Sequence, residues 1–541
     1  MNFGRCVGIC FRALLIGTLL GATGVVSAQG HSLVNAAISA MGGEAALNAL
    51  NTIALRGTDQ QREYESSYEP GAKAELRPAG EAKFFVQRDL AGGSARTDWE
   101  RRVTRIQPKP LELKYSEIMA NEIGYVAGVD SQSRTAISLR SSPPGHPMSG
   151  ARAAIVLREL TRRSPRLVLD MKANPAAVRA LAPVKVNGKD YPALQYDVRN
   201  FSFVVLFDPA SKLPAIIRTR DADPIQGDAH FDMTLADWRD VAGVKIAHSL
   251  EYHLNGRNTL SIRYDQVTAN PALHSTLFEI PITARAIAVQ ASRANSGIPH
   301  QWMMRRGHWG NLMDSDTVGW DISARGEPDL VDIAPGVSQS RGVSHNSVVV
   351  EMDKYLVILD APVNEQFSEW MIKASKARYP GKPIKYLMLT HHHWDHTSGA
   401  RTYVAEGATV VVGPGNRAHF AQMFSAPGAA LNDRLHNSPR AAQIIEVKDK
   451  HVLKDARREV GFYFIETQHS TGTLIAFVPD AKLGFVTDLW SPGRDPLLAK
   501  LRPGELDVMK GLKRWNLDAE NFAGGHGAVG PVAPLMKLSG L

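Results

Sequence analysis

Apolar residues recur along this sequence with changing spacing, and each spacing predicts a different part of the fold. Between residues 31 and 50 they follow a helical repeat, and from Ile53 to about residue 285 they alternate with polar residues as in β-strands. Beyond residue 326, strand-like runs alternate with helical ones. We therefore expect a strand-rich domain over residues 29–285 and an α/β domain over residues 326–541.

Short strand-like runs fill the first region, and turn signals such as Asn187-Gly188 and Asn255-Gly256 separate them. One helical interlude, Ala151–Leu160, interrupts them. This pattern predicts one antiparallel sheet or half-barrel. The predicted strands are Lys83–Gln87, Ala95–Ile106, Ala193–Val198, Phe201–Phe207, Phe231–Leu235, Leu250–Leu254 and Thr259–Tyr264.

Three segments of this region resemble periplasmic lipoprotein carriers of the LolA type. They are VLFDPASKLP at Val205–Pro214, AGVKIAH at Ala242–His248 and FEIP at Phe278–Pro281. The resemblance implies an apolar concavity for an acyl chain or a similarly apolar polymer. The alternative is a sheet that simply packs on its own helices.

Residues 286–325 join the two regions and carry the large side chains of Trp302, Trp309 and Trp320. So many large apolar groups predict a connector that docks on a neighbouring domain, and the alternative is a lid over an active site.

The later region begins with two apolar runs, Ser347–Met352 and Tyr355–Leu359, which predict a hairpin. Glu365–Arg378 then places apolar residues on one helical face, and Ile384–Leu389 is apolar enough to be a strand buried on both sides. We expect a layered α/β domain here.

The first 28 residues predict a secretory signal peptide. Arg5 and Arg12 precede a short apolar run, and Val26 and Ala28 fit cleavage after Ala28. An uncleaved membrane anchor is the alternative. We expect a periplasmic or secreted protein without an integral membrane span after cleavage.

The charge and the cysteine content limit the possible partners and metal ligands of the protein. The formal charge is 62 − 54 = +8, a modest excess without a basic run, so we expect no nucleic-acid partner. Both cysteines, Cys6 and Cys10, lie in the predicted signal peptide. Any metal site of the mature chain must therefore use nitrogen and oxygen ligands.

The segment THHHWDHTSG, residues 390–399, directly follows the predicted buried strand. Loops at the carboxyl ends of strands are where α/β folds bind ligands, and imidazoles with carboxylates are zinc ligands when thiolates are absent. In extended backbone, His391 and His393 point the same way and could hold one metal, while Asp395 and His396 can turn toward a second. His392 and Trp394 would face elsewhere.

This segment resembles the zinc-binding signature of the metallo-β-lactamase superfamily, and the resemblance extends over about residues 330–541. It implies an αββα sandwich, and it implies three further ligands in HSTGT, TD and AGGHG: His469, Asp488 and His526. Carried over residue by residue, it predicts two Zn²⁺ ions, with other divalent metals as alternatives. His391, His393 and His469 would bind one zinc, Asp395, His396 and His526 the other, and Asp488 both.

Asp488 stands where the lactamases that use a thiolate carry cysteine, so the chain looks more like the glyoxalase II, lactonase, phosphodiesterase and ribonuclease branches. Two bridged zincs would lower the pKa of a water from about 15.7 toward about 7 and so form a hydroxide nucleophile. Asp395 would orient it, which makes Asp395 and Asp488 the predicted catalytic residues. His345, at the head of the first hairpin, could contact substrate at the mouth of the site.

The sequence thus predicts a secreted, zinc-dependent hydrolase that uses a metal-bridging hydroxide. The bond cleaved could be an ester, lactone, thioester, phosphodiester or amide, in a small or lipid-like molecule. Three alternatives stay open: a β-lactamase, an iron-dependent oxygenase of the same fold, and a carrier protein with a structural metal domain.

Overall fold

The computed structural model of the chain describes residues 30–104, 109–132, 134–287, 304, 327–342, 344–494 and 499–541. The predicted signal peptide and the connector residues Trp302, Trp309 and Trp320 lie outside the described residues. Among the helices that are described, each is too short or too polar to cross a lipid bilayer.

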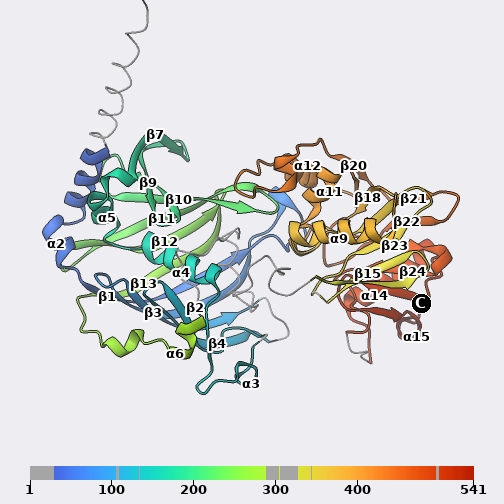
Figure 1. Ribbon diagram of the computed structural model, residues 1–541, viewed down its shortest axis with the longest axis horizontal. Helices are drawn as coiled ribbons and strands as arrows, with labels where there is room; N and C mark the ends of the chain where they lie inside the picture. Colours follow the sequence, from blue (N-terminus) through green and yellow to red (C-terminus); the bar gives the residue numbers. More distant parts are fainter. Residues whose placement is uncertain are drawn as a thin grey trace, which may run out of the picture.

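A thirteen-stranded antiparallel sheet forms the first region, in the order β6-β5-β4-β3-β2-β1-β13-β12-β11-β10-β9-β8-β7 (Figure 1). The strands form two meanders that meet where β1 pairs with β13. Their bounds are β1 (Thr52–Glu63), β2 (Arg77–Asp89), β3 (Ser94–Val103), β4 (Leu111–Ala120), β5 (Ile123–Gly128), β6 (Gly145–Pro147), β7 (Val178–Val186), β8 (Lys189–Val198), β9 (Phe201–Phe207), β10 (Pro214–Asp223), β11 (Gly227–Val241), β12 (Val244–Leu254) and β13 (Arg257–Ala269).

Two of the turns in this sheet follow directly from sequence. Asn187 and Gly188 connect β7 to β8, and Asn255 and Gly256 connect β12 to β13, each with positive φ at both residues. Asparagine and glycine tolerate this conformation, which matches the twist of the flanking strands. The predicted antiparallel, strand-rich fold is confirmed.

Short helices accompany the sheet, and α4, which contains the predicted helix Ala151–Leu160, packs on it together with α5 (Figure 1). Val205, Phe231 and Tyr252 of the sheet join Ala153 and Leu157 of α4 in one core. The helical elements are residues 30–40, α2 (Glu44–Ala49), η1 (Gly71–Lys73), α3 (Ala136–Leu139), α4 (Gly150–Arg162), α5 (Leu167–Ala173), η2 (Pro175–Ala177), η3 (Ser275–Phe278) and α6 (Ile282–Ile287).

Two further sheets form the later region. The first is seven-stranded, in chain order: β14 (Asp329–Ala334), β15 (Val337–Arg341), β16 (Val348–Glu351), β17 (Leu356–Leu359), β18 (Ile384–Met388), β19 (Thr409–Val412) and β20 (Gln443–Glu446). The second is six-stranded: β21 (Lys450–Lys454), β22 (Glu459–Phe464), β23 (Leu474–Val478), β24 (Leu483–Val486), β25 (Asn521–Gly524) and β26 (Val529–Pro531).

Helices cover the outer face of each sheet (Figure 1). On β18, Leu387 packs toward α9 and α11, while its neighbour Met388 packs toward Phe462 of the second sheet. On the far side, Phe477 packs with Met509 of α14. The helices are α9 (Glu365–Arg378), α10 (Trp394–Thr397), α11 (Ala400–Glu406), α12 (Arg417–Ser425), α13 (Arg434–Asn437), η6 (Pro479–Ala481), α14 (Pro503–Trp515) and α15 (Ala533–Ser539).

These contacts give four layers, so the predicted αββα arrangement is confirmed, as are the hairpin β16–β17, the helix α9 and the doubly buried strand β18. The first region also contacts this sandwich through its backbone. Asp228 N donates to Pro427 O at 2.6 Å, and Thr471 N donates to Tyr68 O at 2.8 Å.

Candidate metal centre

The histidine-rich segment begins where β18 ends. His393 has extended backbone, and α10 begins at Trp394, so Asp395 and His396 lie in its single turn. The change from extended to helical backbone at Trp394 gives these two residues a different direction from that of His393. The structure accordingly sorts the four side chains into two groups, as the alternation predicts.

The first group consists of His391, His393, His469 and Asp488, whose possible ligand atoms all lie within 4.8 Å of one another. His469 comes from the loop between β22 and β23, and Asp488 follows the end of β24. The Nε2 atoms of His391 and His469 face each other at 3.3 Å. Two facing nitrogens can share at most one proton, whereas their two lone pairs could hold one metal ion.

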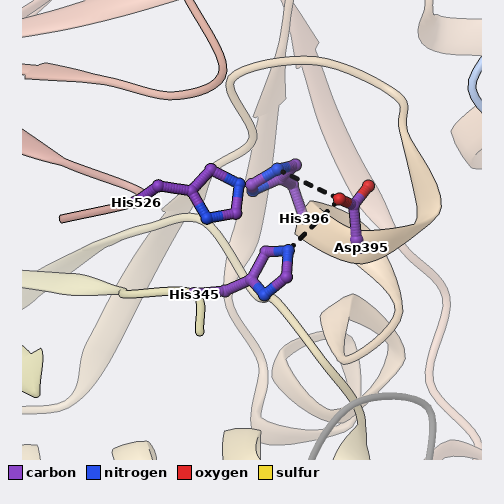
Figure 2. Close-up of side chains that lie close together, drawn as sticks. All are labelled: His345, Asp395, His396 and His526. Carbon is purple, nitrogen blue, oxygen red and sulfur yellow. Dashed lines mark hydrogen bonds and ion pairs between the residues drawn. The ribbon is translucent and has the colours of Figure 1, made fainter. Parts of the chain in front are cut away.

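The second group consists of His345, Asp395, His396 and His526, again within 4.8 Å of one another (Figure 2). His345 comes from the loop between β15 and β16, and His526 follows β25. The loops that follow β15, β18, β22, β24 and β25 therefore converge on one edge of the sandwich.

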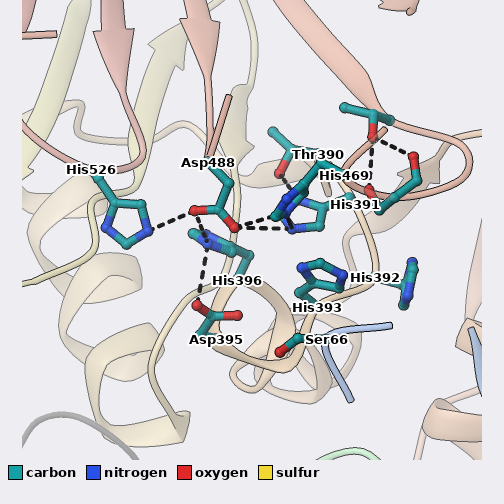
Figure 3. Close-up of polar contacts among 12 residues, drawn as sticks. Ser66, Thr390, His391, His392, His393, Asp395, His396, His469, Asp488 and His526 are labelled. Carbon is teal, nitrogen blue, oxygen red and sulfur yellow. Dashed lines mark hydrogen bonds and ion pairs between the residues drawn. The ribbon is translucent and has the colours of Figure 1, made fainter. Parts of the chain in front are cut away.

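Asp488 lies between the two groups (Figure 3). Its Oδ2 is 3.1 Å from His469 Nε2 and 3.4 Å from His391 Nε2, both of the first group. Its Oδ1 is 3.2 Å from His396 Nε2 and 2.8 Å from His526 Nε2, both of the second group. Each carboxylate oxygen thus faces a different group, which is the geometry that a carboxylate shared by two metals requires.

The backbone at Asp488 has φ 61°, a left-handed conformation that is unfavourable for a residue other than glycine. Neighbouring backbone bonds hold it there: Leu489 N donates to Thr487 O, and Gly525 N donates to Val486 O, both at 2.7 Å. Strained residues of this kind gather at functional sites.

Hydrogen bonds to carbonyl oxygens fix the tautomers of two histidines. A carbonyl oxygen can only accept, so His526 Nδ1, at 2.8 Å from Ser344 O, must donate. Likewise, His393 Nε2 must donate to Ser67 O at 3.0 Å. In neutral rings this leaves Nε2 of His526 and Nδ1 of His393 with the lone pair that a metal needs.

Burial and charge set the protonation states. Burial lowers the pKa of His391 to about 4 and that of His393 well below its usual value, which favours the neutral, ligating form. Burial would also lower the pKa of His396, but Asp488 and Asp395 outweigh it and raise that pKa to about 10. Burial opposes the charge of Asp488, yet His396 and the other imidazoles hold its pKa well below its ordinary value.

His345 lies deeper in the site than the sequence suggested. Its Nε2 is 3.2 Å from Asp395 Oδ2, and its ring centroid is 4.3 Å from that of His526 (Figure 2). Burial, followed by the nearby His526, lowers its pKa to about 4. His345 thus has the position of a possible ligand as well as of a substrate contact.

The sequence did not predict three residues that position the ligand loops. Asp360, at the end of β17, accepts hydrogen bonds from Thr390, and Asn346 donates to Gly524 O and Gly527 O beside His526. The third is Ser67, from the thirteen-stranded region. Asp360 gives a local signal, a polar residue directly after an apolar strand. Ser67 gives none, because its contact spans more than 300 residues of sequence.

His392 and Trp394 are both buried and belong to neither group, in agreement with the expectation that they face elsewhere. A cleft of about 460 Å³ opens over the centre and is lined by His469, Asp488, Arg502 and Asp507, among others. A substrate can therefore approach Asp488 from solvent.

The donor set fits divalent metals. It contains six imidazoles and two carboxylates and no thiolate. Nitrogen and oxygen donors suit zinc, and they also suit iron or manganese.

Comparison with known proteins agrees with this part of the structure. Residues 340–526 match the family described as the metallo-beta-lactamase superfamily. A search of curated proteins finds no match. This family match, together with the four layers, bears out the resemblance predicted from THHHWDHTSG.

Solved structures similar to the chain include a metallo-beta-lactamase from Pontibacter korlensis, at 15% identity and TM-score 0.31, over 40% of this chain and 98% of that one. Another is the metallo-beta-lactamase FIM-1 from Pseudomonas aeruginosa, at 16% identity and TM-score 0.31, over 40% of this chain and 94% of that one. A third is the sec-alkylsulfatase Pisa1 from Pseudomonas sp., at 16% identity and TM-score 0.31, over 40% of this chain and 41% of that one. The LolA-type resemblance finds no support in these matches and stays a prediction.

Proposed function

Since residues 340–526 match the metallo-beta-lactamase superfamily, we propose that the chain is a hydrolase whose centre binds two divalent metals, preferably zinc. The placement of Asp488 carries this proposal. One of its oxygens faces two imidazoles of the first ligand group, and the other faces two imidazoles of the second. A carboxylate with a purely structural role does not need four imidazole neighbours.

The metals, when bound, would polarise the substrate's carbonyl or phosphoryl oxygen and acidify the attacking water. The chain's own residues set the geometry. Asp488 keeps the two ligand groups adjacent, and Asp395, whose pKa is lowered chiefly by His396 against the effect of burial, stays an acceptor that can orient the water. Asp360 and Asn346 hold the loops that carry these ligands.

The substrate class that we propose is an ester, lactone, thioester, phosphodiester or amide. The test is a panel of chromogenic esters, lactones, phosphodiesters and β-lactams, assayed with metal-free protein before and after zinc is added. We expect zinc-dependent turnover of at least one class, and we expect the Asp488→Asn variant to lack it. Turnover that is equal without metal would contradict the proposal, and turnover of β-lactams alone would make the chain a β-lactamase.

An iron-dependent oxygenase is the competing reading. The second ligand group argues against it, because His345, Asp395, His396 and His526 supply a complete set of donors for a second metal. Iron in the purified protein together with oxygen consumption would favour the oxygenase.

A second function, ligand binding by the thirteen-stranded region, is favoured by one buried cation. Arg88 lies between a cavity of about 130 Å³ lined by Phe84, Trp99 and Leu260 and a smaller one of about 50 Å³. Burial lowers its pKa to about 10, and its Nη2 donates to Leu160 O at 2.8 Å. Among the described residues, no carboxylate lies within ion-pair distance of Arg88. Besides its apolar residues, the larger cavity is lined by the charged side chains of Asp59, Glu117, Glu159, Arg101, Arg152 and Arg163. The buried guanidinium of Arg88 beside apolar walls favours an anionic, amphipathic ligand.

A fluorescent fatty acid tests this second function. We expect saturable binding to the full chain and weaker binding to Arg88→Met, while Arg218→Met, which loses an ion pair with Asp232 on the same sheet, binds normally. Equal binding by all three proteins would contradict it. Purified protein that carries lipid but no metal would favour a carrier with a structural metal domain.

We also propose export, with cleavage after Ala28, from the charge and apolar pattern of the first 28 residues. The mass of the protein recovered from the periplasm or medium tests it. An intact Met1 in the recovered chain would contradict cleavage.

A further inference from the structure

One carbonyl oxygen of the thirteen-stranded region holds two side chains of the histidine-rich segment. Ser67 O is 3.0 Å from Nε2 of His392 and 3.0 Å from Nε2 of His393. All three residues are at most 3% exposed, so water does not compete for these bonds. Figure 3 shows the preceding Ser66 beside His393, although the two belong to distant parts of the chain.

This contact decides which nitrogen of His393 can bind a metal. The carbonyl oxygen accepts only, so the proton of the neutral ring sits on Nε2 and the lone pair on Nδ1. His393 then offers Nδ1 to the group that contains His391, His469 and Asp488. Without Ser67 O, the ring could exchange tautomers or rotate. In a fraction of the molecules, the nitrogen that faces the metal would then carry a proton and could not bind it.

The same segment is tied to a second ligand loop. Tyr68 O accepts a hydrogen bond from Thr471 N at 2.8 Å, two residues after His469. Residues 64–74, which we call the bridging segment, thus touch both loops that supply histidines to the first group.

The bridging segment is itself braced by its own sheet. Arg257, at the start of β13, donates from Nη1 to Gly71 O at 2.9 Å and from Nη2 to Ala74 O. Its guanidinium also lies over the ring of Tyr64 at 4.2 Å. Ser67 Oγ donates to Glu69 O at 2.6 Å, which fixes the turn that presents the Ser67 carbonyl.

We propose that Ser67 of the bridging segment is a positioning residue of the metal centre, whose carbonyl selects the Nδ1-ligating tautomer of His393. The first metal site is therefore completed by the strand-rich region, and residues 326–541 alone do not form it in full. This inference rests on the proposed metal-binding function and adds to it the dependence of one region on the other.

The test compares full-length variants. In the first, two glycines replace residues 66–69, which removes the Ser67 carbonyl from its place. In the second, Arg257→Gln removes the guanidinium that braces the bridging segment and leaves the sequence of the segment unchanged. Arg218→Gln is the matched control, because it removes an arginine from the same sheet and leaves the bridging segment unchanged.

Zinc affinity, measured by competition with a chromogenic chelator, is the first readout. Loss of the partner of a ligating histidine typically weakens metal binding about 10- to 100-fold, so we expect that loss for the two-glycine variant. Arg257→Gln should fall between it and the control. Unchanged zinc affinity in a two-glycine variant with a native circular dichroism spectrum would overturn the inference.

The tautomer of His393 is the second readout, measured in metal-free protein by ¹⁵N–¹H correlations of the imidazole ring, with His393→Gln to assign the signal. We expect the Nε2–H form in the native chain and a mixture in the two-glycine variant. A native His393 with its proton on Nδ1 would overturn the inference. If the native chain bound no zinc yet showed the Nε2–H form, the proposed function would fail while the contact stood.

Discussion

Asp360 accepts two hydrogen bonds from Thr390, one with each carboxylate oxygen: Oδ1 accepts from Thr390 N at 2.7 Å and Oδ2 accepts from Thr390 Oγ1 at 2.9 Å. Both residues are fully buried, and Thr390 immediately precedes His391. Burial raises the pKa of Asp360 to about 6. The end of β17 thus fixes the start of the ligand loop that follows β18.

We predict that Asp360→Asn weakens both the fold and the metal centre. An amide offers one acceptor oxygen where Thr390 needs two, so one buried donor loses its partner, at a cost of about 1–3 kcal/mol in the free energy of unfolding. Urea unfolding and zinc content measure the two effects. Asp353→Asn, at an exposed turn, is the control. Stability and zinc content equal to the control would show that Asp360 does not position the loop.

We predict that Asp488→Asn lowers turnover by at least about 10²-fold while the fold is retained. Asparagine keeps the shape but removes the charge that faces four imidazoles, so metal of the second group should be lost as well. Steady-state rates and metal analysis of the same samples provide the measurement. Asp518→Asn, on an exposed loop, should behave as the native chain. Normal metal content with normal rates would reduce Asp488 to a strand-end polar residue.

We predict that Gly525→Ala disrupts the loop that carries His526. A Cβ at this position would lie 1.6 Å from Thr487 Oγ1, which is buried and has little room to move. The loop must then shift, and His526 with it. A reduced number of bound metals would show this. Gly30→Ala, whose Cβ would meet only Leu194 at 3.8 Å, should leave metal binding intact. Full metal binding by Gly525→Ala would mean that the loop adapts without cost.

We predict an acid-sensitive contribution from Glu159 of α4. Burial would raise the pKa of this carboxyl group, but Arg162, Arg158 and Arg163 outweigh burial and lower it to about 2. A carboxyl group with a depressed pKa stabilises the fold above its unfolded pKa of about 4.3, and this stabilisation is lost as the pH falls toward 2. Glu159→Gln should therefore be less stable than the native chain at pH 7, with a smaller difference at pH 3.

Urea unfolding at the two pH values measures the effect on Glu159, with the exposed Glu112→Gln as control. A difference between native chain and Glu159→Gln that is the same at both pH values would contradict this assignment.

Much of the metal centre could be predicted because its signal is local. His391, His393, Asp395 and His396 lie within residues 391–396, and the strand before them is apolar apart from Lys385. Four residues of a loop and the strand ends before His469, Asp488 and His526 were enough to place the ligands on one edge. His345 and Ser67 could not be placed as closely, since their contacts depend on how distant loops meet.

The thirteen-stranded sheet was predicted only in part, for a physical reason. Several of its buried positions carry charged or polar groups, such as Asp59 and Gln61 on β1 and Asp221 on β10. Asp221 pairs with Arg158 of α4 at 2.7 Å, which satisfies its charge inside the fold. Buried polar groups of this kind interrupt the alternation of apolar and polar residues that marks a strand, so β10 and the Asp59–Gln61 part of β1 are not among the predicted strands.

The most direct measurement of the central claim is anomalous diffraction at the zinc edge from crystals of the full chain grown with zinc. We predict two peaks, one on each side of Asp488. The first should lie within bonding distance of His391, His393 and His469, and the second within bonding distance of Asp395, His396 and His526. A single peak, or no peak, in crystals of catalytically active protein would contradict the two-metal centre.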